Sequence, residues 1–483
     1  MPSTEEGGGA VGAVSTDQTI TDNNDFVSIR INLLRWKGEL ANLESLFKAS
    51  NGTAYPLIRK VPSTLSRNED FKKYFKPKVI SIGPLHQDDG TLQESNDLKL
   101  KLAAHFVRNI DDVEQYRNMK KEIDDLKRCY DPQELANYRD DDEELAWMFF
   151  VDGCAILQAV YMRYGDDISS EYDRLFIKND LLTFVYSDLF LLENQIPFRV
   201  LELLTSSSDG AKFMNAIIRF IDDSVITPAE NRFGSSEWWP QQEGKQIHLL
   251  HLLRVRLLFK KEKPRGWGIH KRLLLRLEKL RRWCFPFCIE HEDRKKERTK
   301  RCHSHTIHNV KQLKKLGISL KASETSCLTD ISFNRILFVG KLCLPPISVD
   351  DSTMNLIAYE MCPDFHNNFA VTSYMCFLDL LIDEAEDVKD LRDAGILYNR
   401  LGSDEEVAKL FNKMNTGLVP SPMIYSGVKR KIHDHCKTTW IKHFAQGYHT
   451  YFRSPWTFLA FVGAITALLL AALQTYYTIH QQK

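Results

Sequence analysis

The sequence predicts a mainly helical protein with a small β-hairpin element and a C-terminal transmembrane helix. Apolar residues recur at three- and four-residue intervals over much of the chain, which is typical of amphipathic helices. Two short runs between residues 331 and 349 have β character, and Gly340 and the pair Pro345 and Pro346 bound the second, which favours a hairpin. Because proline cannot donate a ladder hydrogen bond, this hairpin is expected at a sheet edge. Residues 454–479 lack charged side chains and are long enough to cross a bilayer.

The N-terminal part begins with a polar segment. Residues 1–25 are rich in Gly, Ser and Thr and predict a disordered tail. They contain neither a basic residue nor an apolar run, so no secretory signal is expected. Helical spacing of apolar residues predicts an amphipathic helix at residues 33–47. Residues 79–82 form a short extended run that ends in a turn, and residues 94–129 are charged with helical periodicity.

Two apolar helices are expected at residues 145–163 and 172–204. The acidic run at residues 140–144 immediately precedes the first of them, where negative charge stabilises a helix N-terminus. Pro197 interrupts the second. Because proline is tolerated in the first turn of a helix, one helix should end near Glu193 and another should begin near Pro197.

Further helices are expected towards the C-terminus. The run IHLLHLLRVRLLF at residues 247–259 is one, and an apolar stripe between residues 374 and 382 indicates another. Asp350 stands before the run TMNLIAYE, as an N-cap residue does. Ser403 and Glu406 have the spacing of a capping box.

A basic segment interrupts the chain. Residues 254–301 carry 18 Lys and Arg against 6 Asp and Glu, and we interpret residues 254–305 as an insertion or long loop. It could be a solvated, partly disordered insertion. It could lie along anionic lipid, because basic residues gain free energy near such a surface and the neighbouring Trp283, Phe285 and Phe287 suit an interface. A nucleic-acid contact or nuclear signal is the third interpretation, although no nucleic-acid-binding motif supports it.

The uncharged span predicts a single-pass membrane anchor. Trp456 lies at one end and Tyr476 and Tyr477 at the other, where aromatic belts belong. Basic residues up to Arg453 outnumber the single Lys483 beyond the span, which places the main domain in the cytosol by the positive-inside rule. The alternative is a buried core helix, but core helices of this length rarely lack polar residues on one face. The sequence does not distinguish the plasma membrane from endomembranes.

Sequence signatures of catalysis are missing. The chain contains no Walker-type phosphate loop, GxGxxG, GxSxG or HExxH motif. We therefore expect no enzyme activity, and we assign no catalytic residue and no cofactor. The ten scattered cysteines are expected to be reduced thiols.

The sequence contains two groups of potential zinc ligands. The first lies within 22 residues and comprises Cys284, Cys288, His291, Cys302, His303 and His305. The second comprises His433, His435 and Cys436. Structural zinc takes four ligands, and neither group has the spacing of a standard zinc finger. No metal site is predicted.

The run LLENQIPF places Glu193, Asn194 and Gln195 between two apolar stretches. These polar residues could contact a ligand or a partner. Alternatively, their side chains cap the ends of two abutting helices, because buried backbone groups must be satisfied. The capping interpretation predicts that Asn194→Ala lowers stability before it alters any activity.

Several sequence blocks resemble the plant family catalogued as domain of unknown function 247. They include VPSTL, KPKVISIGPLH, FFVDGCAIL, DLFLLENQIPFRVLELL, DDSTMNLIAYE and GILYNRLGSDEEVAKLFN, and they follow the family order over roughly residues 55–479. The residues that match its motifs, which we interpret as structural, are Asp152, Gly153, Glu193, Asn194, Gln195, Pro197, Ser403, Asp404, Glu405 and Glu406.

The resemblance implies a land-plant origin and a single mainly helical domain. We place this domain at residues 26–453, between the N-terminal tail and the transmembrane helix at residues 454–479, with a short tail at residues 480–483. The resemblance implies no reaction, because none is established for the family.

Some grass members of the family are implicated in self-incompatibility. A protein-interaction or recognition and signalling role is therefore expected, with the lipid bilayer and an unknown protein as partners. The alternative is a soluble-acting regulator whose basic segment binds nucleic acid or directs it to the nucleus. A hydrolase is a third hypothesis, which would need serine, histidine and acidic side chains to converge in a pocket.

Overall fold

The chain divides into two units, residues 1–55 and 56–483. The computed structural model describes only residues of the second unit. These are residues 57–92, 94–109, 113–138, 140–165, 177–227, 238, 248–260, 309–336, 339–365, 368–414, 417–437 and 455–481. The predicted N-terminal tail, the predicted helix at residues 33–47 and residues 261–305 of the basic segment lie outside these ranges.

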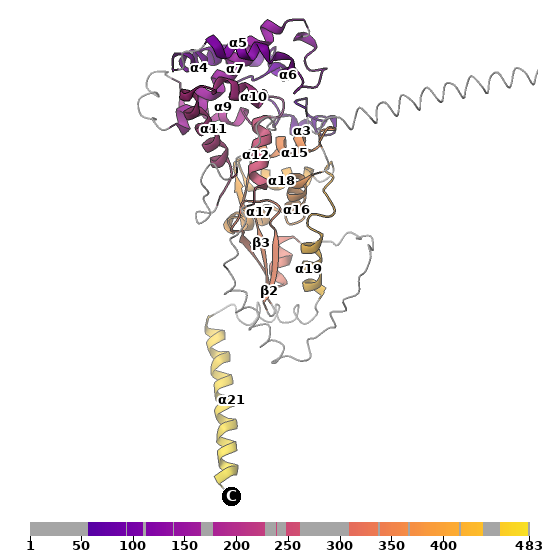
Figure 1. The fold of residues 1–483 in the computed structure, drawn as a ribbon. Helices are drawn as coiled ribbons and strands as arrows, with labels where there is room; N and C mark the ends of the chain where they lie inside the picture. Colours follow the sequence, from indigo (N-terminus) through magenta and orange to yellow (C-terminus); the bar gives the residue numbers. More distant parts are fainter. Residues whose placement is uncertain are drawn as a thin grey trace, which may run out of the picture. The chain divides into compact units, whose positions relative to one another are not determined.

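The first half of the described chain is helical (Figure 1). Its helices are α2 (Ser63–Ser66), α3 (Glu69–Lys72), α4 (Ser95–Asn109), α5 (Val113–Lys121), α6 (Ile123–Lys127), α7 (Asp142–Tyr164), α9 (Asn179–Asp188), α10 (Phe198–Leu204), α11 (Ala211–Ser224) and α12 (Leu249–Leu258). The prediction of a mainly helical fold is confirmed.

Helix α7 is the centre of this half and packs against α4, α10 and α11. Its first turn is acidic, as expected, and the Asp141 carboxylate accepts a hydrogen bond from the Glu144 amide (2.9 Å). The helix is apolar on nearly all sides, which is typical of a helix surrounded by protein. Gly153 allows α10 to approach closely: a Cβ atom there would lie 2.5 Å from Leu204 Cδ1 and 2.9 Å from Val200 Cγ1.

The second half mixes helices with two small sheets (Figure 1). Its elements are α14 (Val310–Lys315), β1 (Ile318–Ala322), β2 (Ser332–Ile336), β3 (Val339–Leu344), β4 (Ile347–Val349), α15 (Asp351–Glu360), α16 (Ala370–Asp379), α17 (Ala385–Asp393), β5 (Leu397–Asn399), α18 (Asp404–Met414) and α19 (Ser426–Lys437). Strands β4 and β5 pair in parallel.

The predicted hairpin is present, but its expected place at a sheet edge was wrong. Strand β3 pairs antiparallel with β2 and parallel with β1, so it is the central strand of three. Pro345 and Pro346 follow the last residue of β3, so neither proline removes a ladder hydrogen bond. Proline at this position ends the strand without forcing it to an edge.

The expected break in the apolar stretch 172–204 is also present. Helix α10 begins at Phe198 with Pro197 as its N-cap. Helix α9, however, ends at Asp188, which is five residues before the expected end at Glu193. Residues 189–197 therefore form a connection that carries the polar triplet Glu193, Asn194 and Gln195.

The two halves share one hydrophobic core. Helix α12 contacts α11 on one side and α15 on the other. Arg254, counted above with the basic segment, lies within α12 and forms a buried ion pair with Glu360 of α15 (2.8 Å). Arg256 of the same helix is also buried and pairs with Asp222 (2.6 Å). The basic excess of residues 254–305 thus includes two arginines that belong to the core.

Helix α21 (Pro455–Gln481) differs from α7 in its surroundings. Both are long and apolar enough to cross a membrane. Helix α7 is almost wholly covered by protein, whereas every described residue of α21 from Leu459 to Tyr477 is exposed. Among the described residues, α21 is therefore the candidate membrane span, and α7 is a core helix.

Candidate functional site

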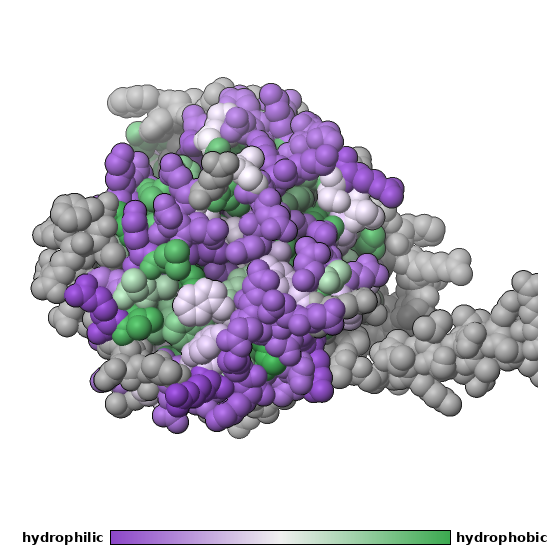
Figure 2. Space-filling view, turned by 90° about the horizontal axis from the view of Figure 1, so that it is seen from above, coloured by the Kyte–Doolittle hydropathy of each residue, from purple (hydrophilic) through white to green (hydrophobic). Residues whose placement is uncertain are grey.

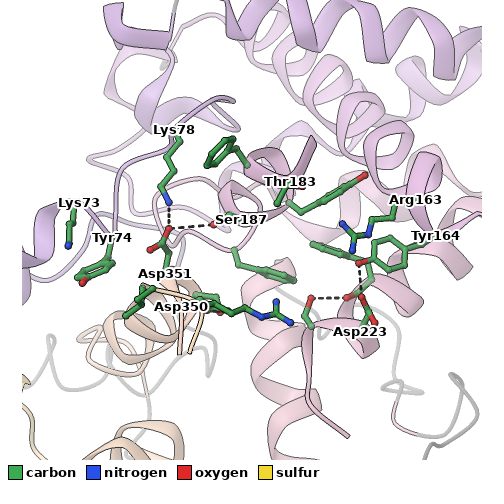
Figure 3. A pocket seen from close by; sticks show the side chains of 18 of the residues that line it. Lys73, Tyr74, Lys78, Arg163, Tyr164, Thr183, Ser187, Asp223, Asp350 and Asp351 are labelled. Atoms are coloured by element: carbon green, nitrogen blue, oxygen red, sulfur yellow. Dashed lines mark hydrogen bonds and ion pairs between the residues drawn. The ribbon is translucent and has the colours of Figure 1, made fainter. Parts of the chain in front are cut away.

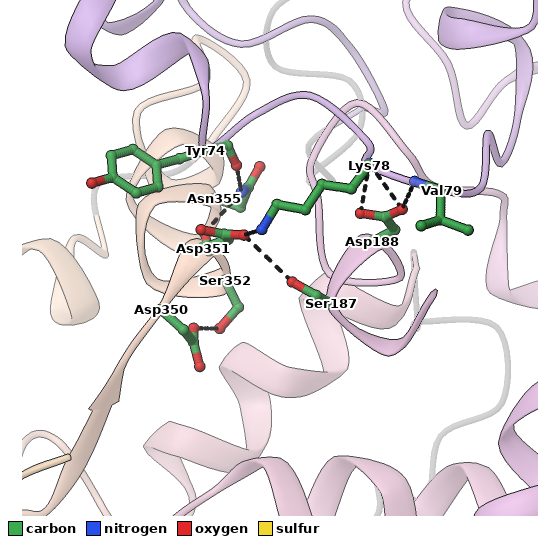
Figure 4. A network of polar contacts seen from close by, with 9 residues as sticks. All are labelled: Tyr74, Lys78, Val79, Ser187, Asp188, Asp350, Asp351, Ser352 and Asn355. Atoms are coloured by element: carbon green, nitrogen blue, oxygen red, sulfur yellow. Dashed lines mark hydrogen bonds and ion pairs between the residues drawn. The ribbon is translucent and has the colours of Figure 1, made fainter. Parts of the chain in front are cut away.

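Two of the family-motif residues, Asp152 and Asn194, bind an extended segment at residues 78–83. The Asp188 carboxylate accepts hydrogen bonds from the backbone amides of Lys78 (3.0 Å), Val79 (2.8 Å) and Ile80 (3.1 Å). The next amides, in chain order, donate to Ser95 Oγ (2.9 Å), Asn194 Oδ1 (2.7 Å) and Asp152 Oδ2 (2.8 Å). Six consecutive amides thus each have a side-chain acceptor. We call Ser95, Asp152, Asp188 and Asn194 the amide clamp (Figure 4 shows Asp188 with Lys78 and Val79).

The clamp residues are buried, and opposing effects act on the pKa values of their two carboxylates. Burial raises the pKa of Asp152, and the ammonium group of Lys99, 2.8 Å from its other carboxylate oxygen, opposes that rise. Burial likewise raises the pKa of Asp188, against the three amides that bind its ionised form. Gly83, at the end of the segment, has φ +74°, and a Cβ atom there would lie 2.5 Å from the Gln195 carbonyl oxygen. A residue with a side chain would therefore be strained at this position.

Gln195 and Asn194 also bind the backbone around the end of α9. The Gln195 amide donates to the carbonyls of Leu189 (2.8 Å) and Leu191 (2.7 Å), and its oxygen accepts from the amide of Leu250 in α12 (3.2 Å). Asn194 donates to the Asp188 carbonyl (3.0 Å). The helix ends that these side chains meet belong to α9 and α12. The expectation of two abutting helices, α9 and α10, was therefore wrong for the second helix.

The remaining family-motif residues lie outside the amide clamp and make contacts of their own. Glu193 accepts from the Val61 amide (2.7 Å) and lies 3.1 Å from His86 Nε2. Ser403 is the N-terminal cap of α18, where its Oγ accepts from the Glu406 amide (3.2 Å). Asp404 pairs with Arg392 (2.9 Å). Glu405 is exposed, and Glu406 lines the cleft described next.

A cleft of about 630 Å³ lies between the two halves of the described domain (Figure 3). One wall comes from the ends of α7, α9 and α11, and the other comes from the start of α15 and the connection between β5 and α18. The residues near Lys73 and Lys78 close one end. Its volume is within the range of small-molecule sites, which is about 300–1,000 Å³. Sequence analysis did not predict this site, because its lining comes from segments far apart in the chain.

The first wall is aromatic. Phe190 stacks on Phe220 with ring centroids 4.8 Å apart, and Tyr164 and Tyr186 complete the cluster. The guanidinium carbon of Arg163 lies 5.5 Å from the ring centroids of both Tyr164 and Tyr186. A cation over aromatic faces is attracted by their π-electrons.

The second wall is acidic, but its carboxylates have partners. Asp351 forms an ion pair with Lys78 and accepts from Ser187 (3.5 Å; Figures 3 and 4). Asp350 caps α15, and burial raises its pKa although the hydroxyl of Ser352 opposes the rise. The described lining of the cleft contains no histidine and no cysteine.

An aromatic patch lies on another face, over α5 and α7. Tyr116, Trp147 and Phe150 contact one another, with ring centroids 5.4–6.0 Å apart. Trp147 is 52% exposed. Seen from above, the described surface is largely hydrophilic, with smaller hydrophobic areas between the polar residues (Figure 2). The Tyr116 hydroxyl donates to Glu143 (2.7 Å), and burial together with Glu143 raises the pKa of Tyr116 to about 12.

The anchor flanks and the candidate zinc ligands are only partly described. Tyr476 and Tyr477 are exposed at the end of α21, and Trp456 lies in its first turn. Arg453 and all six candidate zinc ligands between residues 284 and 305 lie outside the described residues. In the part of the chain that the structure describes, no three His, Cys, Asp or Glu side chains are grouped as metal ligands. His435 instead contacts the Leu316 carbonyl (3.2 Å).

Comparisons with known proteins identify the family. A family model described as DUF247, plant protein of unknown function, matches residues 58–470. A UPF0481 protein of Arabidopsis thaliana is 28% identical over 417 residues, which is 83% of this chain and 82% of that protein. A putative UPF0481 protein of the same plant is 29% identical over 178 residues, which is 35% of this chain and 33% of that protein. No solved structure matches. The family model covers more than half of the chain, and the chain therefore belongs to the DUF247 family of plant proteins of unknown function.

Proposed function

We propose that this protein is a membrane-anchored recognition component whose helical domain binds a protein partner from the cytosolic side of a membrane. Helix α21 carries this proposal. Its 27 residues would extend about 40 Å at 1.5 Å per residue, against a hydrocarbon core of about 30 Å. Exposed leucines such as Leu468 (71%) and Leu470 (62%) are costly in water and favourable in lipid.

The aromatic patch on α5 and α7 supports the proposal that the domain binds a protein partner. Aromatic residues are enriched at the centres of protein interfaces, where they supply much of the binding free energy. Trp147 is the most exposed of the three rings, and the Lys120–Glu143 ion pair stands at the edge of the patch. An apolar centre with a charged rim is the usual composition of such a surface.

Membrane fractionation tests the anchor. The full chain should sediment with membranes and resist alkaline extraction, whereas a chain truncated after Arg453 should become soluble with an unchanged melting temperature. Leu468→Lys together with Leu469→Lys should release the chain as well, because a lysine at mid-span costs about 3 kcal/mol. The matched variant Leu468→Val with Leu469→Val should stay in the membrane. Membrane retention of the truncated chain would contradict the proposal.

Protease protection on intact microsomes tests the orientation. With one tag at each terminus, the N-terminal tag should be digested and the C-terminal tag protected.

Photo-crosslinking tests whether a protein partner binds the aromatic patch. A photoreactive residue in place of Trp147 should give discrete protein adducts that the same residue in place of exposed Asp393 does not give. Protection of the N-terminal tag, or identical adducts from both positions, would count against the assignment.

A further inference from the structure

The cleft carries an inference that does not depend on the membrane anchor. We propose that the aromatic end of the cleft between α7, α9 and α11 binds a small ligand with an anionic group on an aromatic ring. The anionic group would be a carboxylate or a phosphate, held by Arg163 and Arg400. The ring would lie against the wall formed by Phe184, Tyr164 and Tyr186.

The two arginines supply the charge. Neither guanidinium group has a carboxylate within ion-pair distance among the described residues, unlike Lys78 in the same cleft. Arg163 reaches the cleft from α7, and Arg400 reaches it from the connection after β5. A guanidinium group prefers planar oxyanions, which it can bind with two parallel hydrogen bonds.

Both arginines line the cleft, one from each wall, and both act on the Tyr164 hydroxyl. Burial and Asp223, which accepts from the Tyr164 hydroxyl (3.0 Å), raise the pKa of Tyr164 to about 12. Arg163 and Arg400 both act in the opposite direction on this hydroxyl. Arg163 and Arg400 therefore both act on the region around the Tyr164 hydroxyl and Asp223, and Arg400 also acts on Asp350.

Most acidic residues of the cleft have partners of their own. Asp351 is paired with Lys78. Asp350 is bound by the hydroxyls of Ser352 and Ser348, and the positive charge of Arg400 also acts on its carboxylate. Glu406 is exposed, on α18. The carboxylates therefore stand mainly on the wall opposite the aromatic rings, where they would orient an anionic ligand away from themselves.

The aromatic side of the site is accessible. Phe184 is 47% exposed and lines the cleft beside Thr183. A ring stacked on the exposed face of Phe184 removes apolar surface from water. A volume of about 630 Å³ accommodates a two-ring ligand.

Titration calorimetry on the full chain in detergent tests this assignment. The probes are 2-naphthoate, 1-naphthyl phosphate, the neutral 2-naphthamide and inorganic phosphate. We expect saturable binding of at least one naphthyl anion, with the amide bound at least about tenfold more weakly, because charged hydrogen bonds are the stronger ones. Comparison of the carboxylate with the phosphate distinguishes the two possible anions.

Variants separate the two parts of the site. Arg163→Gln and Arg400→Gln should each weaken the anion about tenfold and leave the amide unchanged, whereas Phe184→Ala should weaken all naphthyl probes alike. Arg108→Gln, an exposed arginine of α4 outside the cleft, should change nothing. These positions are exposed, so the melting temperature without ligand should be retained. Equal binding of acid and amide, no saturable binding of either naphthyl anion at millimolar concentration, or an equal loss in Arg108→Gln would overturn the proposal.

Discussion

Six consecutive amides, from Lys78 to Gly83, donate to four side chains from distant parts of the chain. These amides belong to neither a helix nor a paired strand, so side chains must supply their hydrogen-bond acceptors. The Asp188 carboxylate accepts hydrogen bonds from three of the six amides. It thereby supplies the acceptors that the carbonyl groups of a neighbouring strand would otherwise provide. The motif residues therefore have a structural explanation that requires no ligand.

Asn194 should be one of the most sensitive residues. Asn194→Ala leaves the Ile82 amide and the carbonyls of Ile80 and Asp188 without their partner. Each buried, unsatisfied group costs about 1–3 kcal/mol, so we expect a loss of about 2–4 kcal/mol in the free energy of unfolding. Urea unfolding measures it. The matched variant Asn96→Ala, at an exposed position of α4, should change stability by less than about 0.5 kcal/mol. Similar losses in both variants would refute the clamp.

Asp379 should make stability depend on pH. Burial and the neighbouring Asp383 raise its pKa to about 6, against about 3.9 in an unfolded chain. Because the folded-state pKa is the higher one, the stabilisation from protonation is present below about pH 4 and is lost as pH rises through 6. The loss is up to about 3 kcal/mol.

Asp379→Asn removes this charge. The variant should therefore gain stability relative to the parent protein at pH 7 and gain little at pH 4.5, as measured by urea unfolding at both values. Asp393→Asn, at an exposed position of α17, serves as the control and should show no such difference. A gain that is the same at both pH values would show that the Asp379 charge is not the cause.

At the scale of elements, close packing of α7 on α10 depends on Gly153. Gly153→Ala would gain about 1 kcal/mol of helix propensity but would press its Cβ against Leu204 and the stiff, β-branched Val200. Overpacking costs about 1–3 kcal/mol, so the net effect should be a loss of up to about 2 kcal/mol. Gly427→Ala in α19 meets no atom within 4 Å and should instead stabilise by about 0.5–1 kcal/mol. Thermal unfolding distinguishes the two signs, and the same sign in both would refute the packing argument.

Local signals were sufficient for some elements and not for others. Capping residues and apolar periodicity predicted α7, α15 and α18, because these signals lie within the helix itself. The parallel pairing of β1 with β3 could not be predicted, since it joins strands about twenty residues apart and depends on tertiary packing. The early end of α9 at Asp188 was missed for a similar reason, because Gln195 accepts and donates bonds that only the folded chain provides.

At the scale of the whole molecule, the two halves are held together by polar bonds as well as by the shared core. The Asn355 side chain of α15 accepts from the Leu192 amide (2.8 Å) and donates to the Tyr74 carbonyl (2.8 Å). The cleft lies at the same junction, so its lining could not be read from any single stretch of sequence. The family motifs pointed to the clamp residues Asp152 and Asn194. Asp188 opens the block DLFLLENQIPFRVLELL but was not singled out, and Ser95 lies outside the quoted blocks.

The shared core predicts that the halves reassemble. Fragments 1–285 and 286–483, expressed together, should co-purify through an affinity tag on one of them, because the Arg254–Glu360 and Asn355–Leu192 contacts cross the division. Asn355→Ala should weaken the association, whereas Asn334→Ala on the exposed side of β2 should not. Fragments that fold and purify separately would show two independent domains.

The amide clamp has a consequence for synthesis on the ribosome. Asp152, Asp188 and Asn194 follow the amides that they bind by 69 to 112 residues. At about 5–20 residues per second, the segment at residues 78–83 waits on the order of ten seconds for its acceptors to be made. During that interval its amides remain open to other strands, and closing a loop of this length is slow. The N-terminal half should therefore need protection by chaperones until the end of α9 has emerged.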